Sequence, residues 1–148
     1  MNKDTSIQFH HSVIYNPKFG TKPKGLDIVR IQITNVFTKI DMLLSAERAT
    51  LQNGKIYLHN EIYLQDTQTE EKYPFLCAEN IAVYPEFQIY NSEQEIIPIT
   101  LYFKNVPDTV RYVNIIELDI DTQDAFNYNF YMVSLEEEQN IQVKICKN

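Results

Sequence analysis

The feature that most constrains this chain of 148 residues is an alternation of apolar and polar residues that recurs from one end to the other. Ile31 and Ile33, for example, alternate with Arg30 and Gln32. We find no 3.6-residue apolar period long enough to predict a stable helix. Because successive side chains of a strand point to opposite faces of its sheet, the alternation predicts half-buried strands and an all-β fold.

The alternation and the turn residues together divide the chain into expected strands. These cover residues 7–15, 29–34, 38–46, 56–58, 61–65, 72–78, 97–103, 110–118, 126–133 and 141–145. Asn53-Gly54 is the favoured pair for a type I′ turn, so it predicts a hairpin that returns the chain into residues 56–58. Asp66-Thr-Gln-Thr-Glu70 predicts a second hairpin, because Asp and Thr side chains bond nearby backbone groups. Pro98 lacks an N–H, which places its strand at a sheet edge or marks the strand's beginning.

The last long strand is apolar on both faces. Its first face carries Phe126, Tyr128, Phe130 and Met132, and from residue 130 onward the opposite face carries Tyr131, Val133 and Leu135. A strand of this kind is expected to be covered on both sides. It would lie centrally in the fold or at a subunit contact.

Glycine is scarce, and Gly20, Gly25 and Gly54 all lie in the first 54 residues. Nothing after Gly54 can form a glycine-rich phosphate loop, which disfavours the usual nucleotide-binding α/β folds. Barrel corners usually rely on glycine or bulges, so a closed barrel is the second choice. The sequence predicts a single domain over residues 1–148, a two-sheet antiparallel β-sandwich of immunoglobulin-like type with roughly eight to ten short strands.

The charge of the chain bears on its partners. Thirteen basic and twenty acidic residues give a net charge of −7 at pH 7, and the acidic excess lies within residues 49–148. Such a chain repels phosphate backbones, so no nucleic-acid partner is expected. Lys18, Lys22 and Lys24, in a turn-rich loop at 16–25, are the only candidates for a basic patch and are interpreted as solvated. With no export signal and no apolar run long enough for a membrane span, the expected location is the cytoplasm.

The residues form no recognised catalytic motif, so we expect neither an enzyme nor a cofactor. Cys77, in the apolar run 75–78, is expected to be a buried and unreactive thiol, and Cys77 and Cys146 are too few for a disulfide scaffold. The one candidate metal cluster is acidic: Glu117, Asp119, Asp121 and Asp124 could begin a calcium site. Its simpler interpretation is a solvated strand end.

Ten Tyr and eight Phe make the chain aromatic. Tyrosine suits binding faces because it combines a large contact area with a hydrogen-bonding hydroxyl. Most of the aromatic residues fall on faces assigned to the core. The candidate binding residues are the tyrosines that do not: Tyr57, Tyr63, Tyr84, Tyr90 and Tyr131.

Several short patterns resemble one loosely defined family. They are Tyr63-Leu64-Gln-Asp66-Thr-Gln-Thr69-Glu-Glu-Lys72-Tyr73, Ala78-Glu79-Asn-Ile81, Pro85, Thr100-Leu101-Tyr102-Phe103, Pro107, Ile115-Ile116-Glu117 and Phe126-Asn127-x-x-Phe130-Tyr131-x-Val133-x-Leu135. Over about residues 28–135 the chain thus resembles bacterial immunoglobulin-like β-sandwich domains of unassigned function. Members of that family often follow an export signal, and some adjoin a thioredoxin-like domain; this chain shows neither, and it has Glu70 where the family commonly turns with Gly. The resemblance implies the fold and transfers no catalytic role.

Two functions follow from these observations. The first is a non-catalytic interaction module that binds a protein partner through an acidic or tyrosine-bearing face. The alternative is a small-ligand module that holds a sugar or calcium in the loops at one end of the sandwich.

Overall fold

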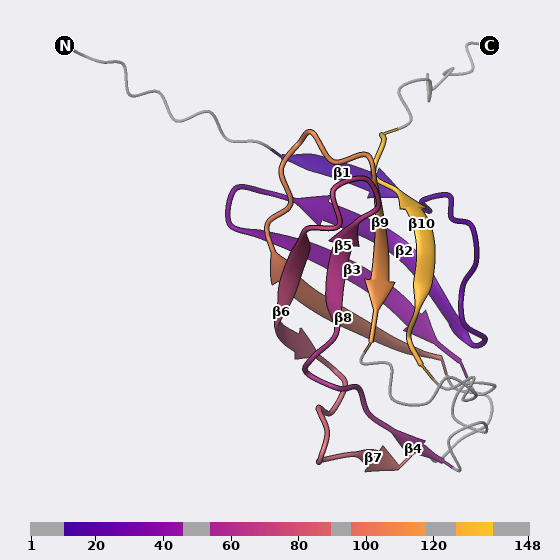
Figure 1. Ribbon diagram of the computed structural model, residues 1–148. Coiled ribbons are helices and arrows are strands. Elements are labelled where there is room, and N and C mark those ends of the chain that lie inside the picture. The colour runs from indigo at the N-terminus through magenta and orange to yellow at the C-terminus, as the bar shows by residue number, and fades with distance from the viewer. Residues whose placement is uncertain (1–10, 46–53, 90–95, 118–126, 138–148) are drawn as a thin grey trace, which may run out of the picture.

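The computed structural model describes residues 11–45, 54–89, 96–117 and 127–137, and every regular element in these ranges is a strand (Figure 1). Eight strands form an antiparallel sheet in the order β1-β2-β3-β8-β6-β5-β9-β10, and β4 and β7 form a small second sheet. The strands are β1 (Ser12–Tyr15), β2 (Leu26–Ile33), β3 (Phe37–Leu44), β4 (Lys55–Ile56), β5 (Tyr63–Asp66), β6 (Lys72–Glu79), β7 (Gln88–Ile89), β8 (Ile97–Lys104), β9 (Tyr112–Ile116) and β10 (Phe130–Ser134). The predicted all-β class is confirmed, while the expected strand at 141–145 lies outside the described residues.

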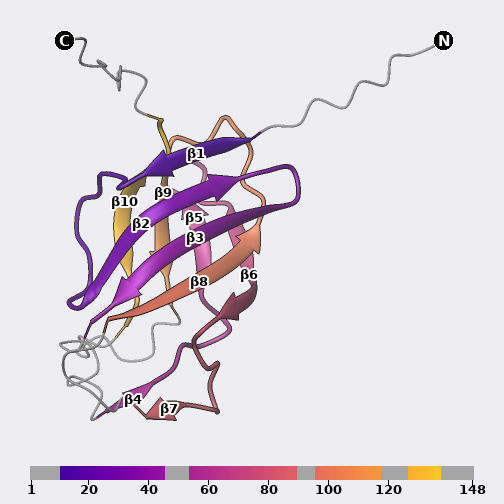
Figure 2. The same ribbon diagram turned by 180° about the vertical axis from the view of Figure 1, so that it is seen from behind.

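The large sheet curls back on itself at β6. In Figures 1 and 2, β1, β2, β3 and β8 lie on one side of the molecule and β5, β9 and β10 on the other. Residues 72–74 of β6 pair with β5, whereas the part from Phe75 to Glu79 pairs with β8, and the register shifts between Phe75 and Cys77. An extra residue bends a strand and increases its twist, so this irregularity turns one half of the sheet to face the other.

The core fills the space between the two halves. Alternate positions point inward, as the period of two predicts, and the largest fully buried side chains include Tyr128, Phe103, Phe130, Leu26, Ile31 and Ile40. Burying one such side chain contributes roughly 1.5–3 kcal/mol. Thr38 is polar and fully buried, but its hydroxyl donates to the Lys104 carbonyl at 3.2 Å and accepts from the Val106 N–H at 3.0 Å.

A bulge in β10 corrects the prediction for this segment. Phe130 pairs with Ile115 and Val133 pairs with Val113, so two residues of β10 lie opposite the single Asn114. The extra residue shifts the alternation: Phe130 and Val133 are buried, whereas Met132 is 46% exposed and has a φ of 58°. The prediction that Met132 shares the inward face is therefore wrong. The apolar residues on both faces reflect a change of phase at the bulge, and β10 is the last strand of the sheet, not a central one.

The loop after β1 covers the outer edge of β10. Gly20 N donates to the Tyr131 carbonyl at 2.8 Å, Tyr131 N donates to the Thr21 carbonyl at 3.0 Å, and Ser134 N donates to the Lys18 carbonyl at 2.8 Å. A Cβ on Gly20 would lie 3.2 Å from that Tyr131 oxygen, so glycine permits the close approach. The two end strands of the sheet, β1 and β10, are thus brought together, and the curled sheet is nearly closed.

The second predicted hairpin is confirmed, and Asp66 organises it. Asp66 Oδ1 accepts from Gln68 N and Asp66 Oδ2 from the Thr69 hydroxyl, both at 2.9 Å, between the paired strands β5 and β6. Glu70 has a φ of 69°, in the left-handed region that favours glycine. It occupies the position at which the resemblance has Gly.

The hairpin predicted at Asn53-Gly54 is wrong as far as the described residues test it. Gly54 does take a positive φ of 81°, but β4 pairs with β7, and both edges of β3 are occupied by β2 and β8. Pro98 is the second residue of β8, which agrees with a strand beginning. Its strand is interior, between β3 and β6, so the edge alternative is excluded.

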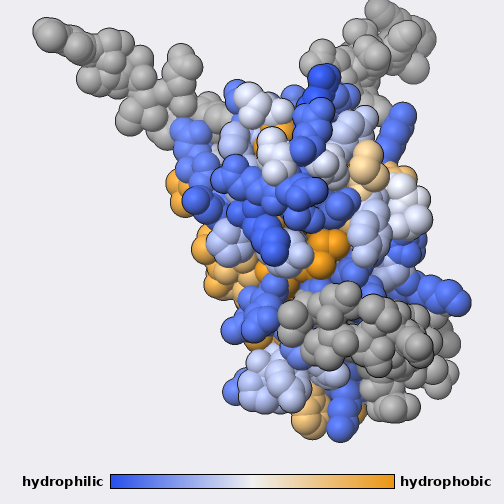
Figure 3. All heavy atoms as spheres, viewed as in Figure 1, coloured by the Kyte–Doolittle hydropathy of each residue, from blue (hydrophilic) through white to orange (hydrophobic). Residues whose placement is uncertain are grey.

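The apolar run on β6 is less buried than predicted. Leu76 is 54% exposed and the Cys77 thiol is free and exposed, so the prediction of a buried Cys77 is wrong. The corner bend explains the difference, because Cys77 lies opposite Tyr102 of β8 immediately after the register shift. Figure 3 shows apolar surface along this side of the molecule.

Candidate functional site

The acidic cluster proposed for calcium is represented by Glu117 alone, since Asp119, Asp121 and Asp124 lie outside the described residues. Glu117 is only 5% exposed, so its interpretation as a solvated carboxylate is wrong. Its Oε2 accepts from the His59 N–H at 3.0 Å and its Oε1 accepts from the Tyr128 N–H at 3.1 Å. The carboxylate therefore ties the loop at His59 to the segment that leads into β10.

Two of the five candidate tyrosines meet in the structure. The rings of Tyr57 and Tyr84 lie 5.7 Å apart between centroids, and the imidazole of His59 lies 4.8 Å from Tyr84 and 5.9 Å from Tyr57. We call Tyr57, His59 and Tyr84 the aromatic triad. The Tyr84 side chain is 54% exposed, so the cluster is a surface feature and not part of the core.

Backbone pairing next to the triad fixes the two segments that carry its rings. Leu58 lies between Tyr57 and His59 and is fully buried, so the alternation turns its two neighbours outward. Leu58 N donates to the Ala82 carbonyl at 3.0 Å, and Tyr84 N donates to the Leu58 carbonyl at 2.8 Å. Together with the bond from His59 N to Glu117, these contacts fix the two segments that carry the rings.

The triad belongs to a lobe that also exposes apolar side chains. Lys55 Nζ lies 4.9 Å from the centroid of the Phe87 ring, and Phe87 and Ile89 are both exposed. The short strands β4 and β7 join these residues at the end of the molecule opposite to β1 in Figure 1. We call residues 54–62 and 80–89 the aromatic lobe.

The remaining candidate tyrosines lie elsewhere. Tyr63 is on β5, where the Lys72 ammonium lies 4.6 Å from its ring centroid. Tyr131 is exposed at the bulge of β10, and its hydroxyl accepts from the Asn129 side chain at 3.2 Å. Tyr90 lies outside the described residues.

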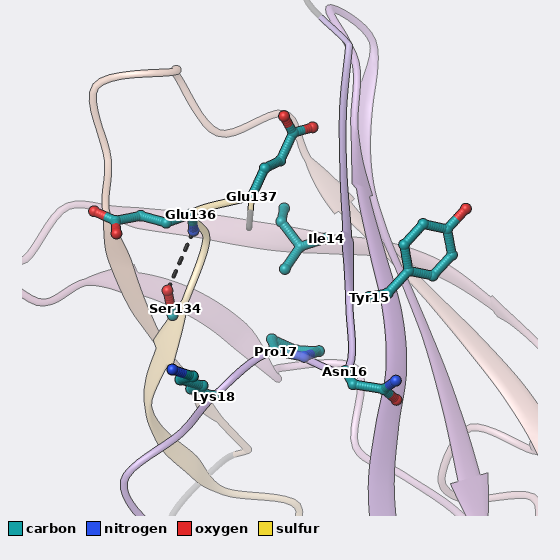
Figure 4. Close-up of a pocket in the computed structure, with 8 residues that line it drawn as sticks. All are labelled: Ile14, Tyr15, Asn16, Pro17, Lys18, Ser134, Glu136 and Glu137. Carbon is teal, nitrogen blue, oxygen red and sulfur yellow. Dashed lines mark hydrogen bonds between the residues drawn. The ribbon is translucent and has the colours of Figure 1, made fainter. Parts of the chain in front are cut away.

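A cavity of about 120 Å³ lies where β1 and the end of β10 face each other (Figure 4). One wall is formed by residues 14–18 and the other by Ser134, Glu136 and Glu137. Glu137 Oε2 reaches across and accepts from Val13 N at 2.9 Å. Glu136 is engaged elsewhere, because its Oε2 lies 2.9 Å from Arg111 Nη2.

The outer face of β1, β2, β3 and β8 carries a polar network. Arg30 Nη2 lies 2.8 Å from Asp41 Oδ2, and the Thr100 hydroxyl donates to Asp41 Oδ1 at 2.8 Å. The hydrogen bond and the charge of Asp41 raise the pKa of the Arg30 guanidinium. On the same face, burial and then the charge of Glu79 raise the pKa of the Tyr102 phenol. These contacts join β2, β3 and β8 across the outer face of the sheet.

No family model, curated protein or solved structure matches this chain. In the described ranges no three His, Cys, Asp or Glu side chains come together as a metal site would require. The same residues contain no helix of the length and hydrophobicity needed to cross a membrane.

Two features of the candidate sites were not found by sequence reasoning alone. The aromatic triad includes His59, which the alternation could have grouped with Tyr57, because the two residues occupy alternate positions along the chain. The cavity between β1 and β10 had no sequence signal, because it depends on contacts between opposite ends of the chain.

Proposed function

We propose that this protein is a non-catalytic module of immunoglobulin-like β-sandwich type that binds a protein partner through its aromatic lobe. Two facing halves of an antiparallel sheet with a continuous core between them support the architecture. The observation that carries the function is the aromatic triad, three rings with centroids 4.8–5.9 Å apart on an exposed lobe.

Rigid exposed aromatic rings favour protein recognition for two reasons. Tyrosine dominates binding energy at protein interfaces because it adds area and a hydrogen bond without many rotatable bonds. The backbone bonds of Leu58 and the Glu117 carboxylate fix the main chain that carries the rings before a partner arrives, so less backbone entropy is lost on binding. Phe87 and Ile89 add apolar area on the same lobe.

The test is affinity capture from the native source with wild-type protein and two tyrosine variants. Tyr84→Ala removes the most exposed ring of the triad, whereas Tyr112→Ala removes an exposed tyrosine from β9, outside the lobe. We expect a partner that wild type and Tyr112→Ala retain and that Tyr84→Ala loses. Thermal melts of both variants establish that each is folded. A partner lost equally from both variants, or no partner at all, would refute the proposal.

A sugar ligand at the same lobe is the alternative, favoured by the exposed Tyr84 face beside His59. Calcium is less well supported, because both Glu117 oxygens already accept backbone N–H groups. A thermal-shift series with oligosaccharides and with Ca²⁺ separates these cases, since a bound ligand raises the melting temperature by mass action. A rise with an oligosaccharide that Tyr84→Ala abolishes would favour the sugar over the protein partner.

A further inference from the structure

Among the described strands, β1 pairs with β2 on one edge and with none on the other. Val13 N donates to the Glu137 side chain, while Asn16 N donates to the Val29 carbonyl of the neighbouring strand. Because backbone groups of a strand alternate in direction, residues 12 and 14 bond to β2, and Val13 and Tyr15 direct their N–H and C=O groups away from the sheet. Within the described residues, the Tyr15 N–H and C=O on this edge have no hydrogen-bond partner.

The open edge continues into a segment that is already paired. Lys18, Gly20 and Thr21 bond to β10 as an antiparallel strand would, with Thr21 opposite Tyr131. Continued toward β1, the same register brings residues 135–137 alongside residues 15–17. There the backbone bonds cease, and the cavity of about 120 Å³ occupies the gap. Across the cavity, the Glu137 carboxylate accepts a hydrogen bond from Val13 N. It takes the position that the carbonyl of a neighbouring strand would occupy.

We propose that this edge of β1 binds an extended, basic segment of a partner protein, which adds to the sheet as a further strand. The carbonyl of the added strand takes the place of the Glu137 carboxylate at Val13 N, and its other backbone groups pair with Tyr15. Exposed strand edges are templates for such addition, in which main-chain bonds supply affinity and side chains supply specificity.

The charges around the gap favour a basic segment. Strand addition releases the Glu137 carboxylate from Val13 N, and a Lys or Arg side chain on the added strand can pair with it. Glu136 stands on the same wall but is paired with Arg111, so Glu137 is the carboxylate that a basic side chain would meet, and Figure 4 shows Lys18 at the opposite end of the cavity from Glu137. The net charge of −7 also steers basic segments toward the protein and acidic ones away.

The probe is a capped pentapeptide, Val-Lys-Val-Lys-Val, titrated into the full chain labelled with ¹⁵N, beside the acidic peptide Val-Glu-Val-Glu-Val. We expect saturable shifts of the Val13 and Tyr15 amide signals with the basic peptide and binding about tenfold weaker with the acidic one. Val13→Pro removes the outward N–H but keeps the bonds to β2, which is where an edge strand tolerates proline. This variant should bind the basic peptide about tenfold or more weakly than wild type, whereas the matched control Val13→Ala should bind it with an affinity within about threefold of wild type.

A second variant keeps the proposal testable if proline disturbs β1. Glu137→Gln retains an oxygen that can accept from Val13 N but loses the charge, so it should reduce the preference for the basic peptide over the acidic one. Tyr84→Ala should change neither affinity, which separates this surface from the aromatic lobe. Equal binding of both peptides by wild type, unchanged binding by folded Val13→Pro, or shifts confined to residues other than the β1 edge would overturn the proposal. So would a dimer in sedimentation that Val13→Pro dissociates, since the occupant would then be a second copy of this chain.

Discussion

Glycine at position 70 is expected to stabilise this protein. Glu70 has a φ of 69°, and a side chain in this left-handed region costs about 1–2 kcal/mol. Glycine avoids that cost but loses about 0.5–1 kcal/mol more backbone entropy on folding. The hydrogen bonds at this residue, from its N–H to Asp66 and from the Gln65 amide to its carbonyl, use the main chain and survive substitution. Glu70→Gly should therefore raise the free energy of unfolding by about 0.5–1 kcal/mol.

The neighbouring position supplies a matched control. Glu71→Gly removes the same charge and the same side chain from the same turn, but residue 71 has no positive φ to relieve. It should lower the free energy of unfolding by about 0.5–1 kcal/mol. Urea denaturation followed by circular dichroism measures both variants, and a change of about 1 kcal/mol shifts the melting temperature of a domain this size by roughly 2–4 °C.

The difference in unfolding free energy between these two variants shows whether the backbone of Glu70 is strained. If both glycine variants lose stability equally, the left-handed conformation of Glu70 carries no strain and the reasoning fails. If both gain equally, the effect comes from the lost negative charge and not from the backbone.

Three further substitutions test the packing and the buried polar groups. Glu117→Gln places an amide donor against a backbone N–H of His59 or Tyr128, so it should lower the free energy of unfolding, measured by urea denaturation, by about 1–3 kcal/mol. The control Glu136→Gln, on the surface, should lower it by less than about 1 kcal/mol. Gly20→Ala puts a Cβ 3.2 Å from the Tyr131 carbonyl, and faster hydrogen exchange of the residue 131 and 134 amides should report the loosened edge of β10. Thr38→Val leaves the buried Val106 N–H without an acceptor, so it should lower the unfolding free energy by about 1–3 kcal/mol, and an unchanged midpoint would show that water replaces the hydroxyl.

The parts of the fold that depend on local sequence could be predicted. The period of two identified inward residues of β2, where Ile31 and Ile33 are buried, because this strand has one buried face and one outer face. The hairpin at 66–70 was evident because the Asp66 and Thr69 side chains bond within the turn itself.

The parts of the fold that depend on pairing between distant segments could not be predicted from the sequence. The bulge in β10 follows from its alignment with β9, and Met132 has no local mark that distinguishes it from Phe130. Cys77 sits in an apolar run like those of the core strands, yet the bend of β6 exposes it. Of the candidate site, sequence identified Tyr57 and Tyr84 separately, but their contact depends on the pairing of Leu58 with Val83.

The central place of β8 also determines when the fold can be completed during synthesis. β3 pairs with β2 through a short local hairpin, but its other edge stays unpaired until β8 is available. The β3–β8 pairing runs from Phe37 opposite Lys104 to Leu44 opposite Ile97. Until residue 104 has left the ribosome, the nascent chain carries a strand of eight residues with alternating apolar side chains and one unsatisfied edge. Such an edge can pair with another chain, so docking of β8 is the step that protects newly made protein from aggregation.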